Sequence, residues 1–189
     1  VSDTSQTASS LNSLDAASTE TVNASTIATL TGAAADINTA YASAGITGLG
    51  DEAVTLTDTS VAASTLNTLN ANTTGTVDAS TVTTITGSVE DANTMYATAG
   101  ISGGGDEAVT ISDTTVAASD LNTLDGYTTG AIDASTLTTI TGSGSDAQTA
   151  FESAGISGLT FDASSYLASY TDLLAAFDGD LTLARTHYF

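Results

Sequence analysis

The sequence predicts an α/β fold: a solenoid of about six strand-helix coils, with a parallel sheet on one wall, helices on the other wall and a small all-α cap at the C-terminus. Two observations predict the solenoid. One long unit occurs three times in the chain, and each half of that unit holds a strand-like stretch followed by a helix-like stretch. Such units cannot bury an apolar face alone, so neighbouring units stack around a continuous core.

The same 55-residue interval is found at several kinds of position. It separates the starts of the phrase Leu-Asn-x-Leu (Leu11, Leu66, Leu121), three aromatic residues (Tyr41, Tyr96, Phe151) and three glycines (Gly45, Gly100, Gly155). Similar stretches also begin at Val54, Val82 and Val109, which divides the interval into two nearly equal halves. Each half has the size of one coil in a leucine-rich-repeat-like solenoid. Residues 1–160 are therefore expected to form three repeats of two coils each.

The first part of each coil is predicted to be a β-strand. β-Branched residues alternate with period two in Val54-Thr-Leu-Thr-Asp, which is typical of strands. Val54 and Leu56 are then expected to face inward, and Thr55 and Thr57 outward. Residues 76–80 are either a further short strand or an extended loop.

The helix in the second coil of each repeat is predicted from its ends. Ser88 is a good N-cap, and Asp91 stands at the third helical position, where a carboxylate meets free N–H groups. Asp36 and Asp146 repeat this placement. Gly100 followed by Ile101 predicts a Schellman stop, with the glycine in the left-handed conformation.

The helix in the first coil of each repeat is predicted to start at Asp58, which recurs as Asp3 and Asp113. Ala62, Leu66 and Leu69 would form its buried stripe. Asn67, with its equivalents Asn12 and Asn122, lies between buried leucines, where asparagine is unfavourable. We expect its side chain to bond the backbone of a neighbouring coil.

The repeat pattern stops after Gly158, and residues 161–189 are expected to form two or three short helices that cover the last coil. Their common face would comprise Tyr166, Leu167, Tyr170, Leu173, Leu174 and Phe177. The pattern Phe-Asp-x-x-x-Tyr-Leu-Ala-Ser-Tyr-x-Asp-Leu-x-x-Ala-Phe over 161–177, followed by Ala-x-x-His-Tyr over 184–188, resembles a short helical repeat of large secreted bacterial proteins, many of them calcium-binding RTX-type. The Thr- and Ala-rich repeats resemble those of very large surface proteins from marine bacteria and cyanobacteria. These resemblances imply a secreted surface or filament component without known catalytic residues.

The acidic composition restricts the kinds of partner that the chain can bind. The chain has one Lys or Arg, 22 Asp and Glu, and a net charge of −21. Such a surface repels nucleic acid and anionic membrane and attracts divalent cations and basic partners. No apolar run approaches the roughly 18 residues of a membrane span, so no membrane insertion is expected. The absence of Cys excludes disulfides and thiolate chemistry. With the scarcity of Lys, it fits an extracellular or cell-surface location.

Two glycine-acid loops are candidate calcium sites. They end in Asp51 and Glu52 and in Asp106 and Glu107, and Ca²⁺ takes carboxylate and carbonyl oxygens on flexible loops. The alternative is a pair of solvated turns, since the nine-residue RTX rhythm is absent. No other cofactor is expected.

No enzyme is expected. His187 is the only histidine and Arg185 the only basic side chain, so the array holds no nucleophile-base set and no phosphate loop with lysine. Arg185 and His187 are expected to satisfy helix-end carbonyls or the nearby Asp178 and Asp180.

The sequence therefore predicts a structural module of a secreted bacterial cell-surface, surface-layer or filament protein, either self-assembling or acting as an adhesin stalk. Assembly is expected through the solenoid ends or edges into a homo-oligomer or polymer. Residues 1–5 match residues 56–60, which predicts a fragment or processed piece that begins inside a strand. The alternative is a ligand-binding module for ice or polysaccharide, suggested by the outward threonines at 55, 57, 84 and 86.

Overall fold

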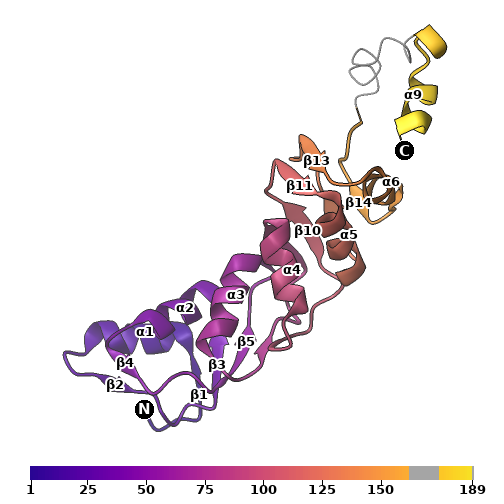
Figure 1. Ribbon diagram of the computed structural model, residues 1–189. Coiled ribbons are helices and arrows are strands. Elements are labelled where there is room, and N and C mark those ends of the chain that lie inside the picture. The colour runs from indigo at the N-terminus through magenta and orange to yellow at the C-terminus, as the bar shows by residue number, and fades with distance from the viewer. Residues whose placement is uncertain (162–174, 189) are drawn as a thin grey trace.

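The computed structural model describes residues 1–161 and 175–188, and over the repeats it is an elongated α/β solenoid (Figure 1). Helices stack side by side along one wall, parallel strands run along the other, and the termini lie at opposite ends. The helices of the array are α1 (Ala8–Ala17), α2 (Ala34–Ala42), α3 (Ala63–Asn72), α4 (Val89–Ala97), α5 (Ala118–Tyr127) and α6 (Gly144–Glu152). The predicted strand-helix solenoid is confirmed.

The strands form two five-stranded parallel sheets and two strand pairs. The first sheet contains β1 (Ser5–Thr7), β3 (Thr29–Gly32), β5 (Ala53–Leu56), β7 (Val77–Asp78) and β9 (Ile101–Ser102). The second contains β6 (Ser60–Ala62), β8 (Thr84–Gly87), β10 (Ala108–Ile111), β12 (Ile132–Asp133) and β14 (Ile156–Ser157). The pairs are β2 (Val22–Asn23) with β4 (Ile46–Thr47), and β11 (Thr115–Ala117) with β13 (Thr139–Thr141).

Each five-stranded sheet joins two neighbouring repeats. In the first sheet, β1 and β3 precede their helices, whereas β7 and β9 follow theirs. Strand β5 connects these two kinds of strand, because it pairs with β3 on one side and with β7 on the other. Strand β6 then begins the second sheet, in which β10 has the same role between β8 and β12. Each five-stranded sheet therefore passes, at β5 or β10, from strands that precede their helices in the chain to strands that follow them.

The strand register explains the repeat length. Ser5 pairs with Thr29 and Thr29 with Ala53, so the first two steps along the sheet are equal in length. A new row starts shortly afterwards, at Ser60, which pairs with Thr84. The length of the repeat is therefore the sum of two equal steps between paired strands and the short segment from Ala53 to Ser60. The helices accordingly begin at alternating intervals that differ by a few residues, at residues 8, 34, 63, 89, 118 and 144, and the expected coils of nearly equal length are confirmed.

One continuous cluster of small apolar side chains fills the space between the two walls. Val54 and Leu56 face inward from β5, and Leu66 and Leu69 from α3, as predicted. Burying each such side chain contributes roughly 1.5–3 kcal/mol. Ala62 is not part of the helical stripe, because it lies in β6 and the fully buried Ala63 takes its place.

Side-chain capping is partly as predicted. The Ser88 hydroxyl accepts a hydrogen bond from the Asp91 N–H at 3.1 Å, and Ser143 caps α6 in the same way. Asp58, however, does not cap its own helix, because α3 begins after Ala62. Its Oδ2 instead accepts a hydrogen bond from the Ala34 N–H, at the start of the helix one coil earlier, at 2.8 Å.

The predicted Schellman stop at Gly100 is wrong. Gly100 is absent from the glycines with positive φ, and α4 ends at Ala97, where the Thr98 N–H donates to the Met95 carbonyl. Gly100 is needed for space, because a Cβ there would overlap Oδ1 of Asn70 from the preceding coil. The left-handed glycine of this connection is Gly103, with φ +82°.

The expected asparagine bonds between coils are confirmed. The side-chain amides of Asn12, Asn67 and Asn122 donate to the carbonyls of residues 36, 91 and 146 at 2.9–3.0 Å. Residues 77–78 of the undecided segment 76–80 form β7. The array is thus joined along both walls, by strand pairing on one and by asparagine side chains on the other.

Beyond the array, residues 181–188 form a further helix, α9 (Leu181–Tyr188). The remaining predictions for the C-terminal cap, including the common face from Tyr166 to Leu174, lie outside the described residues. Within the described part of the chain, no helix combines the length and apolarity that crossing a bilayer requires.

Candidate functional site

The two acidic residues of each candidate calcium loop differ in their exposure to solvent. Glu52 and Glu107 are each 1% exposed, whereas Asp51 and Asp106 are exposed. Both glutamates stand directly before a strand, β5 or β10, which turns their side chains toward the core. A buried carboxylate is costly unless it is hydrogen-bonded, so its partners define the site.

A tyrosine and a glycine hold each buried carboxylate. The Tyr41 hydroxyl donates to Oε1 of Glu52, and the Gly50 N–H donates to the same carboxylate. In the second repeat, the Tyr96 hydroxyl donates to Oε2 of Glu107 at 3.1 Å, and the Gly105 N–H donates to the same oxygen at 2.7 Å. Each tyrosine-glutamate pair therefore closes one loop onto the core.

The tyrosines of these pairs are firm hydrogen-bond donors. Burial and the neighbouring Glu52 carboxylate raise the pKa of Tyr41 above its usual range, and burial and the charge of Glu107 raise the pKa of Tyr96. Both hydroxyls hence keep their protons at neutral pH. The third repeat has Phe151 in place of the tyrosine, which removes the hydroxyl.

Among residues 1–161 and 175–188, no three His, Cys, Asp or Glu side chains are grouped so that they could hold a metal ion. Each loop brings together one exposed aspartate and one buried glutamate. Calcium at Asp51, Glu52, Asp106 and Glu107 stays a prediction, since Ca²⁺ takes six to eight oxygens and backbone carbonyls and water can supply several of them.

A cavity of about 90 Å³ lies beneath the second loop and was not predicted. Its lining is apolar except for one buried carboxylate and one phenol: Leu66, Ala79, Ile85, Met95, Tyr96, Ile101, Gly103, Gly104 and Glu107. The sequence does contain a signal for it, because Gly104 stands where the other two repeats have Leu49 and Leu159.

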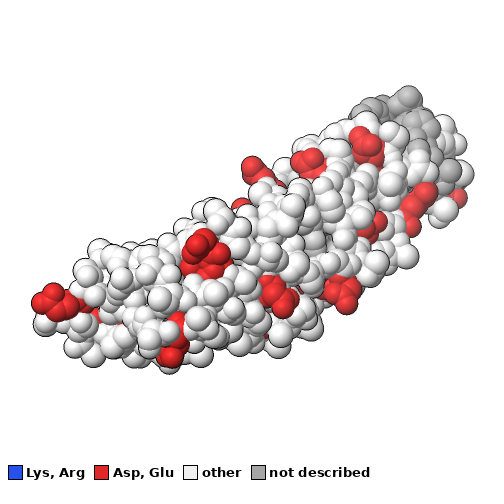
Figure 2. All heavy atoms as spheres, turned by 90° about the horizontal axis from the view of Figure 1, so that it is seen from below, with Lys and Arg blue, Asp and Glu red and all other residues white. Residues whose placement is uncertain are grey.

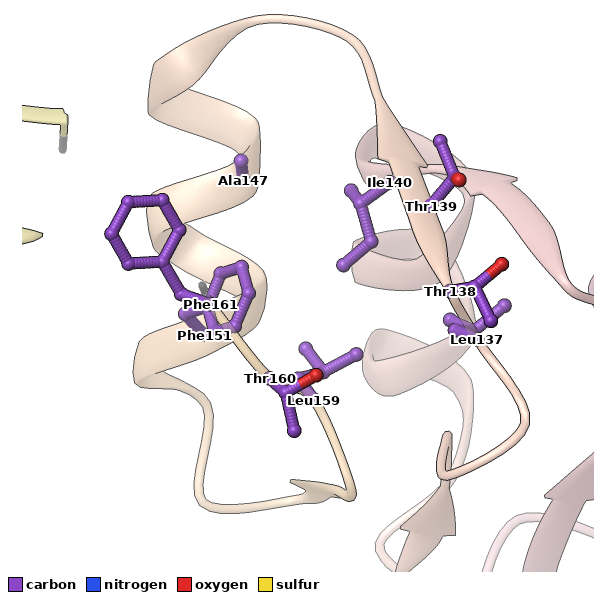
Figure 3. Close-up of a pocket in the computed structure, with 9 residues that line it drawn as sticks. All are labelled: Leu137, Thr138, Thr139, Ile140, Ala147, Phe151, Leu159, Thr160 and Phe161. Atoms are coloured by element: carbon purple, nitrogen blue, oxygen red, sulfur yellow. The ribbon is translucent and has the colours of Figure 1, made fainter. Parts of the chain in front are cut away.

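A second pocket, of about 120 Å³, lies in the last coil (Figure 3). Ala147 and Phe151 of α6 stand on one side, and Thr139 and Ile140 of β13 on the other. Leu159, Thr160 and Phe161 complete its lining. It belongs to the C-terminal end of the array, adjoining the part of the chain that is not described.

The outward threonines form only short rows. In the first sheet, Thr7, Thr31 and Thr55 are in register, but Asp78 and Ser102 continue the row. Figure 2 shows acidic side chains scattered as separate spots over one face of the long body. The row of the first sheet is thus not made of threonine alone.

Arg185 and His187 lie within α9, and their side chains are outside the described part, so the expected contacts with Asp178, Asp180 or helix-end carbonyls stay predictions. Comparison of the chain with protein-family models, with curated proteins and with solved structures finds no match. The fold and these contacts define an acidic α/β solenoid.

Proposed function

We propose that this chain is a structural module of a secreted bacterial cell-surface, surface-layer or filament protein. The module acts as a spacer of fixed length and either assembles end to end or serves as an adhesin stalk. The observation that supports this proposal best is that the recurring polar residues contact the adjacent coil. Asp58 caps the helix of the preceding coil, and Asn67 bonds the helix of the following one.

Buried hydroxyls extend the same pattern. The Thr73 hydroxyl donates to the Glu52 carbonyl at 2.8 Å, and the equivalent Thr128 donates to the Glu107 carbonyl at 2.8 Å. Satisfied polar contacts of this kind make the stack rigid and fix its register. A rigid rod is suited to a spacer, because its length is proportional to the number of coils.

The two ends of the array are complementary. Asp3 is equivalent to Asp58 and Asp113, which cap Ala34 and Val89 of preceding coils, but among the described residues the Asp3 carboxylate accepts only the Gln6 side-chain amide, at 2.7 Å. At the other end, no described carboxylate bonds the N–H of Gly144, the residue equivalent to Ala34 and Val89. Asp3 of one molecule against Gly144 of another would repeat the contact that joins coils within the chain.

Sedimentation velocity and negative-stain imaging of the 189-residue chain over a range of concentrations test this proposal. We expect rods that lengthen with concentration, and weaker association for Asp3→Ala than for the control Glu20→Ala, which removes another exposed acid. Monomers that do not lengthen but bind ice or polysaccharide would contradict the proposal. They would favour the alternative of a ligand-binding module, for which the row Thr7, Thr31 and Thr55 is the supporting observation.

Calcium belongs to this proposal as a possible ligand of the loops at Asp51 and Glu52 and at Asp106 and Glu107. Bound there, it would neutralise charge on a chain with a net charge of −21 and reduce repulsion between molecules. The exposed Asp51 and Asp106 are the residues that would contact it first.

A further inference from the structure

The cavity beneath the second loop is bordered by two residues that differ from their counterparts in the other repeats. In the first repeat Leu49 packs against the core at the equivalent position, and Leu159 does so in the third. Gly104 has no side chain to place there. Met95, which stands where the other repeats have alanine, reaches the cavity wall but leaves about 90 Å³ open.

One carboxylate oxygen in the wall lacks a partner. Both hydrogen bonds to Glu107, from the Tyr96 hydroxyl and the Gly105 N–H, are made to Oε2. Oε1 receives no hydrogen bond from the described residues and lies 3.0 Å from where a Cβ on Gly104 would stand, at the cavity. In the first repeat, by contrast, both oxygens of Glu52 accept hydrogen bonds.

The surroundings favour a cation beside this oxygen. Glu107 is 1% exposed and has no basic side chain near it in the described array, which contains no Lys or Arg. The ring of Tyr96, also in the wall, is held by stacking on Tyr127 with centroids 5.9 Å apart, and its hydroxyl bonds the carboxylate. The net charge of −21 raises the concentration of cations around the whole molecule.

The remaining residues of the cavity wall favour a ligand in which the cationic group carries a hydrocarbon chain. Leu66, Ile85, Met95 and Ile101 present hydrocarbon to the cavity. Its open volume of about 90 Å³ is several times the roughly 10–15 Å³ that one water needs, so a molecule of a few non-hydrogen atoms fits. Gly103 and Gly104, both exposed, form the mouth, so entry needs no movement of a large side chain.

We propose that this cavity binds a small primary alkylammonium ion, with the ammonium group on Oε1 of Glu107 and the alkyl chain against Leu66, Ile85 and Met95. Tyr96 and Gly105 hold the carboxylate in place, and Gly104 provides the space. The site does not depend on the structural role, since Met95 and Gly104 have no counterpart in the other two repeats. So small a ligand binds with a Kd on the order of millimolar.

Titration of the 189-residue chain with propylammonium chloride at constant ionic strength, followed by ¹H–¹⁵N NMR, tests the site. We expect saturable shifts at residues 103–105 and 107, and at least tenfold weaker binding of 1-propanol, which has the same size without the charge. Equal binding of the two compounds, or shifts that do not saturate, would overturn the proposal and leave an unselective apolar cavity.

Two variants sharpen the test. Gly104→Leu introduces the leucine of the other repeats and should abolish the saturable shifts while the protein stays folded, because Gly104 is not among the glycines with positive φ. Glu107→Gln keeps the shape and removes the charge, and should weaken propylammonium binding at least tenfold. If Gly104→Leu binds propylammonium as the parent does, the ion lies elsewhere and the proposal is wrong.

Discussion

Oδ2 of Asp58 accepts a hydrogen bond from the Ala34 N–H at 2.8 Å, so that a side chain in one coil caps the helix of the coil before it. Asp113 repeats the contact with the Val89 N–H at 2.8 Å. A helix N-terminus carries unpaired N–H groups and the positive end of the helix dipole, and a carboxylate satisfies both. The stability of these second helices therefore depends on the coil that follows each of them.

Replacing these aspartates should have unequal effects. Helix α2 has Ala33 at its N-cap and receives no cap from its own side chain, whereas α4 also has Ser88. We expect Asp58→Ala to lower the free energy of unfolding by about 1–2 kcal/mol, and Asp113→Ala by less. Urea unfolding measures both, with Glu20→Ala as the control. An equal loss in the two variants would show that the Ser88 cap does not compensate for the missing carboxylate.

Asn67→Ala removes a contact between neighbouring helices. The Asn67 amide donates to the Asp91 carbonyl at 3.0 Å, and loss of such a partly buried bond costs about 1–2 kcal/mol. Thermal unfolding followed by circular dichroism measures the change. Thr68→Ala is the matched control, because the exposed Thr68 hydroxyl bonds only the Ser64 carbonyl of its own helix. An unchanged melting temperature for Asn67→Ala would remove the inter-coil role.

Gly100→Ala should destabilise the array by crowding, and a second change should relieve it. The new Cβ would overlap Oδ1 of Asn70, and because that half-buried side chain can turn aside, the cost is at the low end for overpacking, about 1 kcal/mol. Asn70→Ala removes the obstructing atom, so the double variant should be more stable than Gly100→Ala alone. A double-mutant cycle by urea unfolding measures the coupling. Additive effects would mean that Gly100 is required for another reason.

The half-buried Tyr41 and Tyr96 predict a loss of stability in alkali. Burial and the adjacent glutamates raise the pKa values of Tyr41 and Tyr96 in the folded chain, so the folded state holds these two protons more tightly than the unfolded state. Their contribution is fully present below the unfolded pKa of about 10 and decreases as pH rises above it. Urea unfolding between pH 8 and pH 11 should show this decrease, flattened in Tyr41→Phe/Tyr96→Phe. A double variant with the parent's slope above pH 10 would exclude the tyrosines as its cause.

Calcium at the glycine-acid loops is tested by melting temperature. If Asp51, Glu52, Asp106 and Glu107 ligate Ca²⁺, millimolar calcium should raise the melting temperature relative to EGTA. Asp51→Asn/Asp106→Asn should reduce that increase, whereas Asp78→Asn should not, because Asp78 stands outside both loops. Identical melting temperatures in calcium and in EGTA would end the prediction.

Local patterns in the sequence predicted local structure well. Alternation identified Val54 and Leu56 as inward-facing, and the spacing of Ser88 and Asp91 identified a helix start. The position of Asn67 between buried leucines indicated a polar contact with a neighbouring coil. In each of these cases, the residues that carry the signal lie within one coil, either in its own strand and helix or on the helix face that contacts the next coil.

Predictions failed where a residue type has a familiar role within one coil but its actual partner lies in a neighbouring coil. An aspartate before a helix looks like the cap of that helix, but Asp58 meets Ala34 of the preceding coil. A glycine after a helix looks like a Schellman stop, but Gly100 makes room for Asn70. The change at β5 from strands that precede their helices to strands that follow them depends on pairing with both β3 and β7, which a single copy of the repeat does not reveal. The cavity at Gly104 follows from one residue that differs among the three copies.

The change of strand type at β5 and β10 bears on how a gene for such an array can grow or shrink. Recombination that adds or removes one whole repeat places every strand, aspartate cap and asparagine donor against an equivalent partner. A change by one coil would place two coils of the same kind next to each other. An aspartate cap would then face a helix that is not the equivalent of its usual partner. Length variants that arise by unequal crossing-over should hence survive selection only as whole repeats, with a period of two helices.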